Sequence, residues 1–252
     1  MQFRARPLIA RRRLVCSCCA GTVVEWLPVP AVLALPTVAT AQEPGNPRVV
    51  AVEKAPFHLP VFSNEYVTLL NVTIPSGATS GYHKHSIDTA SVVVEAANVR
   101  VQVLGEAAVD RQAIIGTSSY SAWSKKPLIH DVTNIDSKPF RVVLFEIMYS
   151  NPGQFSPTSR AEVPEYKAEL DERVRAWRLV LAPGQSVPTI TQRAPGVRIV
   201  VNGGMLVESE SGQPDRAMSL QRGDFFWQEA NATRGVRNAG NTQIELVEFE
   251  PK

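Results

Sequence analysis

The chain has 252 residues, of which 44% are hydrophobic and 20% are charged. This composition can bury one large core or two small ones, which excludes a chain that is disordered throughout. The formal net charge is only +2, too small to predict a nucleic-acid surface. Much of the positive charge lies near the start, in Arg4, Arg6, Arg11, Arg12 and Arg13. We therefore expect a globular protein with no nucleic-acid partner.

The first predicted element is an export signal over residues 1–41. The basic start leads into an apolar stretch that ends in Ala-Thr-Ala at residues 39–41, which predicts cleavage before Gln42. A membrane anchor is the alternative, but Glu25 and three prolines interrupt the run before it reaches the roughly 20 residues that span a bilayer. We expect a periplasmic or secreted protein with no stable membrane anchor after cleavage.

The same segment also contains the group Arg11–Arg13, which loosely matches a twin-arginine signal for the export of folded proteins. All three cysteines lie in this segment: Cys16, Cys18 and Cys19. Their removal with the signal is favoured over a C-x-C-C metal or redox site. The mature protein would then have no disulfide.

From about residue 64 onward the sequence predicts β-strands. Short runs rich in Val, Ile, Leu, Tyr and Phe are separated by turn signals such as Pro75-Ser76-Gly77. Helical periodicity appears only at residues 164–171, where we expect a short helix. The expected organisation is an N-terminal β domain with its arm at 42–150, a linker at 151–171 and a second β domain at 172–252.

The two β domains look like copies of one unit. The sequence EYVTLLNVTIPSGAT at 65–79 aligns without gaps with ERVRAWRLVLAPGQS at 172–186. After a three-residue slip, LFE at 144–146 falls on EFE at 248–250. We expect a duplicated β unit of roughly 85 residues.

Two of the four histidines, His83 and His85, stand one residue apart in GYHKHSIDT. Residues two apart in a strand point to the same face, so both imidazoles would face one side. His130 precedes another predicted strand, and we expect it to return beside the first pair. A solvated strand edge is the alternative interpretation. For His58, in the N-terminal arm, we expect an ordinary surface or packing role.

The second unit serves as an internal control for the histidines. At the matching positions it has Ile190, Gln192 and Arg234, while the glycine, tryptophan and asparagine positions of the scaffold are retained. The joint loss of the three histidines favours one shared function over a role in folding. Arg234 would bind an anion or pair with Glu229 or Glu245. We expect this unit to be mainly structural, with a homodimer face as a further option.

For two tryptophans and two glutamates the sequence favours structural or surface positions. Trp123 and Trp227 occupy equivalent places in both units, which favours packing over contact with a substrate. Glu95 and Glu146 lie in predicted strands. A surface position is favoured for both, with a hydrogen bond to an imidazole N–H as the alternative.

These patterns resemble the motifs of the cupin superfamily. The first motif, a glycine followed by H-x-H and then an acidic residue, is met by GYHKHSIDT at 81–89, and the second, H-x-x-x-N, by HDVTN at 130–134. The resemblance covers about residues 57–150 and 172–252, so the chain is similar to a bicupin. It implies an all-β fold of two double-stranded β-helix (jelly-roll) barrels in tandem, with a divalent metal in the first.

One departure from the family pattern changes the expected site. The usual glutamate falls at Thr89, next to Asp88, and neighbouring strand residues face opposite ways. The expected ligands are His83, His85 and His130, with Thr89 and Asp88 as candidates for lining the site. Three imidazoles suit Fe, Zn or Mn without choosing between these transition metals.

The resemblance implies a metal-dependent enzyme, and the N-terminal signal adds the expectation that it is exported. A dioxygenase-like bicupin acting on a small carboxylate or diketone-like substrate comes first, because three-histidine cupin sites resemble those of dioxygenases that bind such substrates through two atoms. A non-catalytic module that binds a small anion or sugar is the alternative. The third candidate is a purely structural protein, in which the three histidines could be replaced with little effect on function. The fold does not distinguish between these three candidate functions, because one scaffold carries many functions.

Overall fold

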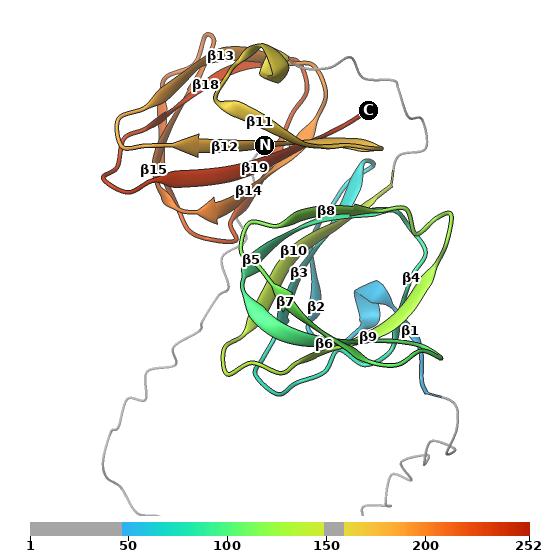
Figure 1. Cartoon of the computed structure of the whole chain (residues 1–252). Helices are drawn as coiled ribbons and strands as arrows, with labels where there is room; N and C mark the ends of the chain where they lie inside the picture. Colours follow the sequence, from blue (N-terminus) through green and yellow to red (C-terminus); the bar gives the residue numbers. More distant parts are fainter. Residues whose placement is uncertain (1–46, 149–158) are drawn as a thin grey trace, which may run out of the picture. The chain divides into compact units, whose positions relative to one another are not determined.

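The computed structural model describes residues 47–148 and 159–252 (Figure 1). The export signal expected over residues 1–41 lies outside the described residues. The described parts are mostly strands, with two short 3-10 helices, η1 (Val52–Lys54) and η2 (Ser159–Glu162). Neither of these described helices has the length or the apolar character to cross a bilayer.

The first barrel consists of two facing sheets. One has the strand order β2-β3-β10-β5-β8 and the other β1-β4-β9-β6-β7. The bounds are β1 Val50–Ala51, β2 His58–Ser63, β3 Val67–Ile74, β4 His83–His85, β5 Thr89–Glu95, β6 Ala97–Val103, β7 Val109–Ala113, β8 Ser118–Ser121, β9 Leu128–Asn134 and β10 Phe140–Ile147.

The second barrel repeats this plan without a counterpart of β1, so that its second sheet has four strands. Its sheets have the orders β11-β12-β19-β14-β17 and β13-β18-β15-β16. The bounds are β11 Tyr166–Asp171, β12 Val174–Leu181, β13 Ser186–Gln192, β14 Gly196–Asn202, β15 Gly204–Glu210, β16 Arg216–Leu220, β17 Phe225–Gln228, β18 Ala232–Asn238 and β19 Ile244–Pro251. The predicted all-β fold of two tandem barrels is confirmed.

Register confirms the duplication at the level of single residues. Thr68 of β3 lies opposite Glu146 of β10, and Arg175 of β12 lies opposite Glu250 of β19. These are the pairs that the gapless alignment and its three-residue slip predict. Positions in the two barrels can therefore be compared directly.

Asn134 and Asn238 close the same turn in the two barrels. The Asn134 side-chain amide donates to the carbonyl oxygens of Ile74 at 2.9 Å and Lys138 at 2.8 Å. Asn238 donates in the same way to two carbonyls at 2.9 and 2.8 Å. Both asparagines are fully buried, where an amide needs partners. The asparagine of the second motif therefore has a structural role.

The short helix expected at 164–171 is absent, because Tyr166–Asp171 form strand β11, paired antiparallel with β12. Lys, Ala, Glu and Leu favour helices, but pairing with a neighbouring strand outweighs that local preference. Tyr166 is buried and Leu170 packs against the core. The second barrel thus begins inside the segment 151–171 that was expected to be a linker.

Strand β10 has two faces with different surroundings. Val143 and Phe145 belong to a core that also contains residues of the second barrel, and the rings of Phe145 and Phe249 are 5.1 Å apart. Val142 and Leu144 instead pack with Val52 and Leu70 inside the first barrel. Even-numbered positions of β10 therefore face the interior of the first barrel.

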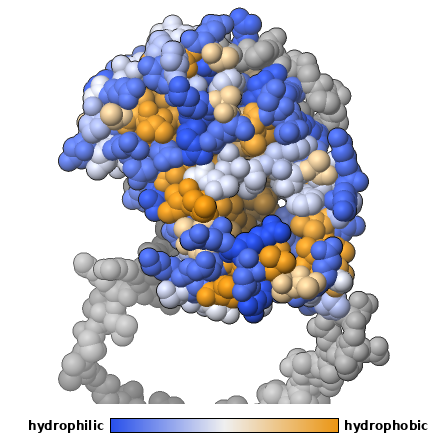
Figure 2. All heavy atoms as spheres, in the orientation of Figure 1, coloured by the Kyte–Doolittle hydropathy of each residue, from blue (hydrophilic) through white to orange (hydrophobic). Residues whose placement is uncertain are grey.

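The outer surface mixes hydrophilic and hydrophobic side chains, as Figure 2 shows for one face. Leu59 and Ile114 are each 60% exposed, and such scattered apolar side chains are usual on soluble domains. They carry no functional conclusion.

Candidate metal centre

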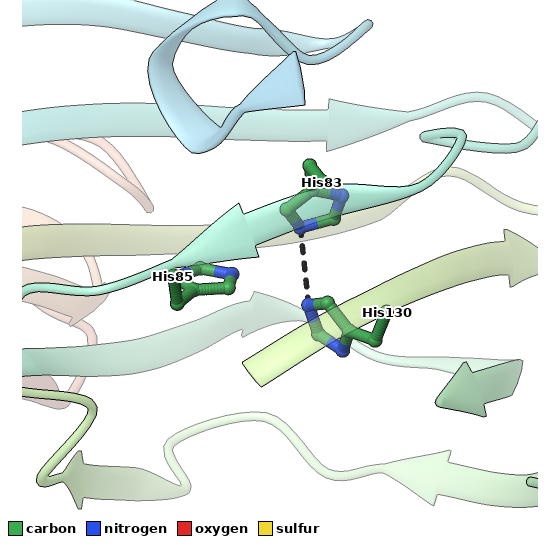
Figure 3. Close-up of side chains that lie close together, drawn as sticks. All are labelled: His83, His85 and His130. Carbon is green, nitrogen blue, oxygen red and sulfur yellow. Dashed lines mark hydrogen bonds between the residues drawn. The ribbon is translucent and has the colours of Figure 1, made fainter. Parts of the chain in front are cut away.

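His83, His85 and His130 lie together on the sheet that contains β4 and β9 (Figure 3). The two strands pair antiparallel, with His83 opposite His130. One ring nitrogen from each histidine lies within 4.8 Å of the others. The H-x-H spacing places His83 and His85 on one face, and the pairing with β9 adds the third imidazole. The structure thus brings together the three ligands expected from the sequence.

The backbone at Gly81 orients the His83 ring. His83 Nδ1 donates to the Gly81 carbonyl oxygen at 2.9 Å, which leaves the lone pair on Nε2. That Nε2 points at Nε2 of His130, 3.0 Å away. Gly81 has φ +64°, a conformation that glycine adopts without steric cost. The glycine of the first motif therefore acts through its backbone.

The environment keeps the three rings neutral. Burial, reinforced by the neighbouring His83, lowers the pKa of His85 and of His130 to about 3. Burial also lowers the pKa of His83. A neutral imidazole has the lone pair that metal binding requires, so at pH 7 the cluster is in its ligating form.

The cluster fits a divalent transition metal. His83 and His85 are only 1% and 4% exposed, and His85 Nδ1 is buried with no hydrogen-bond partner in the described residues. An unpartnered buried polar atom is costly. Three converging neutral imidazoles with such an atom match the donor set of Fe, Zn or Mn sites. Which of these metals is bound depends on metal availability as much as on the donor atoms.

His58, the fourth histidine, also lies at this cluster. It begins β2 and is 9% exposed, and its ring centroid is 4.6 Å from that of His83. Its Nδ1 donates to the Pro56 carbonyl oxygen at 2.9 Å, and burial lowers its pKa to about 4. A packing role was one of the two expectations, but its contact with His83 was not expected. Only the pairing of β2 with β3 brings it there.

Asp88 does not supply the missing carboxylate. Its oxygens accept hydrogen bonds from Tyr120 Oη at 2.9 Å, the Ser124 backbone N–H at 2.8 Å and an Arg173 guanidinium nitrogen at 3.1 Å. Burial alone would raise its pKa, but these bonds outweigh burial and lower the pKa to about 2. Asp88 is an ionised anchor for Tyr120 of β8, for Ser124 and for Arg173, and its oxygens are already engaged.

Thr89 and Glu146 occupy the interior of the first barrel. Thr89 is 4% exposed and lies opposite Glu146 of the neighbouring strand β10. Glu146 is on the same strand face as Leu144 and is 7% exposed, so its expected surface position is wrong. Burial, with a smaller contribution from Glu53, raises its pKa. The match of LFE with EFE gives both units a glutamate at this position, and that is the signal in the sequence that could have pointed to it.

The tryptophans differ in their surroundings. The ring of Trp123 lies 6.0 Å from that of His85, next to the cluster. Trp227 stacks on Phe62 and Tyr66, each with a centroid distance of 5.7 Å. Trp227 has the expected packing role, whereas Trp123 is adjacent to the site.

The second barrel carries no histidine at the equivalent place. Ile190 lies opposite Arg234, as His83 lies opposite His130, so the joint replacement holds in three dimensions. Arg234 Nε lies 3.4 Å from a Glu210 carboxylate oxygen. Its expected partners, Glu229 and Glu245, were therefore wrong, because β18 pairs with β15 and brings Glu210 to it.

Arg160 fills the interior of the second barrel instead. It is part of η2 (Ser159–Glu162), and it is 1% exposed. Its guanidinium donates to Glu248 at 2.8 Å, to Glu250 at 2.9 Å and to Gln192 at 3.2 Å. A cation supplied by the chain itself thus occupies this barrel.

Solved structures share this architecture. AerE from Microcystis aeruginosa matches 79% of this chain and 98% of its own, with 12% identity and a TM-score of 0.52. Salicylate 1,2-dioxygenase from Pseudaminobacter salicylatoxidans matches 74% of this chain and 71% of its own, with 15% identity and a TM-score of 0.52. The chain has the cupin fold. A cupin domain from Bordetella pertussis Tohama I matches 37% of the chain at 27% identity and a TM-score of 0.33. No protein-family profile and no curated sequence matches.

Proposed function

We propose that this cupin is an exported metal-dependent enzyme, dioxygenase-like, that acts on a small carboxylate or diketone-like substrate. The convergence of the neutral imidazoles of His83, His85 and His130 carries the proposal. Salicylate 1,2-dioxygenase, which shares the fold, has been solved in complex with gentisate, and this supports a small organic acid as the ligand class. Fold similarity at this identity supports the architecture only, so the reaction depends on the site.

The chain's own residues would prepare the site in three ways. The three histidines would hold the ion through lone pairs that burial keeps free of protons. Gly81 holds the His83 ring in position through its carbonyl. Burial of His83 and His85 limits the access of water. A bound ion would supply polarisation of a substrate oxygen or, if it is iron, activation of dioxygen.

Metal content is the first test of this proposal. Protein recovered from its native compartment without added metal should contain about one transition-metal ion per chain. His85→Ala should lose most of this metal. Lys84→Ala is the matched control, because Lys84 lies between the two histidines on β4 with its side chain exposed. Full metal loading of the His85→Ala protein would contradict the proposal, and gentisate-dependent oxygen uptake by the wild type would support the dioxygenase class.

A non-catalytic binding module is the second candidate. The observation that favours it is a pocket of about 590 Å³ in the second barrel. Its polar lining and one tryptophan suit a sugar better than an anion, because three glutamates contribute to it. The charged residues and the tryptophan that line this pocket are Glu208, Glu210, Arg216, Trp227, Glu229 and Arg234. Thermal stabilisation by a sugar that survives chelation of metal, without turnover, would favour this candidate.

A further inference from the structure

A glutamate occurs at the same position in both barrels. Glu146 lies opposite Thr68, and Glu250 lies opposite Arg175, the counterpart of Thr68. The second barrel has lost all three histidines but retains this carboxylate. The surroundings of this carboxylate differ between the two barrels.

In the second barrel the carboxylate binds an internal cation. Glu250 accepts a hydrogen bond from Arg160 at 2.9 Å, and the same guanidinium reaches Gln192, the counterpart of His85, at 3.2 Å. It also lies 5.6 Å from the ring centroid of Tyr166. Tyr166 begins β11 as His58 begins β2, at the equivalent register position. The positive charge thus lies among the counterparts of Glu146, His85 and His58.

In the first barrel the same position has a carboxylate but no such cation. Glu146 is 7% exposed and its oxygens are not fully buried, and they have no hydrogen-bond or ion-pair partner within residues 47–148 and 159–252. Across the register from it lie only the hydroxyls of Thr68 and Thr89. A buried carboxylate without a compensating positive charge is unfavourable. Among the described residues, nothing in the first barrel supplies the charge that Arg160 provides in the second.

We propose that Glu146 is the carboxylate of the metal centre, supplying from β10 the negative charge that the family motif places at Thr89 on β5. This inference rests on the proposed three-histidine metal site. Glu146 is not among the groups whose ligand atoms lie within 4.8 Å of one another. In this proposal it acts from outside the three-histidine ligand set and would balance the charge of a bound ion, as Glu250 balances that of Arg160.

Titration of the metal-free protein with cobalt(II) at fixed pH and ionic strength tests the proposal. Glu146→Gln keeps the shape of the side chain and removes its charge. It should weaken cobalt binding about tenfold, the lower end of the effect of outer-shell partners. Glu106→Gln, which removes a carboxylate from an exposed turn, should bind as tightly as the wild type. Equal affinity of Glu146→Gln and wild type would overturn the proposal.

A charge swap separates loss of charge from loss of structure. Thr89 and Glu146 are neighbours on adjacent strands, so Thr89→Glu combined with Glu146→Thr moves the carboxylate by one strand. The swapped protein should recover most of the affinity that Glu146→Gln loses. If the swap binds no better than Glu146→Gln, the assignment of charge is overturned. Should Glu146→Gln not fold, Glu146→Asp is titrated instead and should bind cobalt more weakly than the wild type, with equal binding overturning the proposal.

This experiment distinguishes the inference from the proposed enzyme. Cobalt binding is measured without turnover. A wild-type protein that binds cobalt but oxidises no substrate would overturn the enzymatic function and leave the role of Glu146 intact. A wild-type protein that binds no cobalt would overturn both.

Discussion

At the scale of single residues, two neighbours in the chain, Asp88 and Thr89, have different tasks. Thr89 faces the barrel interior across from Glu146, whereas the oxygens of Asp88 are taken up by Tyr120, Ser124 and Arg173. Strand alternation explains the difference, because adjacent side chains point to opposite faces. The acidic residue in the first motif is thus structural in this chain.

Asp88→Asn should lower the stability by about 1 to 2 kcal/mol at pH 7, because the bonds to the ionised carboxylate are weakened. The folded pKa of about 2 lies below the unfolded value, so the contribution is complete above about pH 4 and is lost as the pH falls towards 2. Urea unfolding of both proteins at several pH values measures this. Asp110→Asn, at an exposed ion pair with Arg100, is the control and should change stability little. A difference that persists at pH 2 would contradict the prediction.

At the scale of elements, the segment that begins at η2 decides what the second barrel contains. Arg160 enters the interior and contacts Glu248 and Glu250, both fully buried. The Arg198 guanidinium also binds Glu248, at 2.6 Å. These charged side chains can be buried because each has a partner of opposite charge. The segment before β11 is therefore part of the barrel core.

Arg160→Ala should destabilise the protein by about 3 to 5 kcal/mol, because it leaves two buried carboxylates with too little positive charge. Thermal unfolding of the purified variant measures the loss. Arg100→Ala removes an arginine from a surface ion pair and should change the stability little. Equal unfolding temperatures for Arg160→Ala and Arg100→Ala would show that the network contributes nothing.

At the scale of the whole molecule, the metal-free protein should lose stability in mild acid. His58, His85 and His130 have folded pKa values of about 3 to 4, and that of His83 is also lowered. Below about pH 6.5 the unfolded chain binds protons that the folded protein does not, so stability falls as the pH falls from about 6.5 towards 4. Urea unfolding with a chelator present measures this slope. His130→Gln should reduce it, and stability that is constant between pH 7 and 5 would contradict the prediction.

Export makes a separate prediction about the whole chain. If residues 1–41 are a signal, the protein recovered from its producing cells should begin at Gln42. Sequencing of the mature N-terminus measures this directly. A protein that retains Met1 and stays with the cytoplasmic fraction would contradict export and leave the metal site unaffected.

Features that depend on local spacing follow from the pattern of residues alone. Alternating apolar runs predict strands, and the gapless match between the halves predicts two copies of one barrel. The H-x-H spacing of His83 and His85 places both rings on one face, because a strand has a period of two. His130 was identified by its motif and by its loss from the second copy.

The folded structure is needed to show which distant segments meet. It placed His58 against His83, directed Glu146 inward, and inserted Arg160 into the second barrel. It also made residues 166–171 a strand, because β12 offered a partner that outweighed helix propensity. These outcomes depend on pairing between strands far apart in the chain, and the free energy of such pairing is absent from any local pattern of residues.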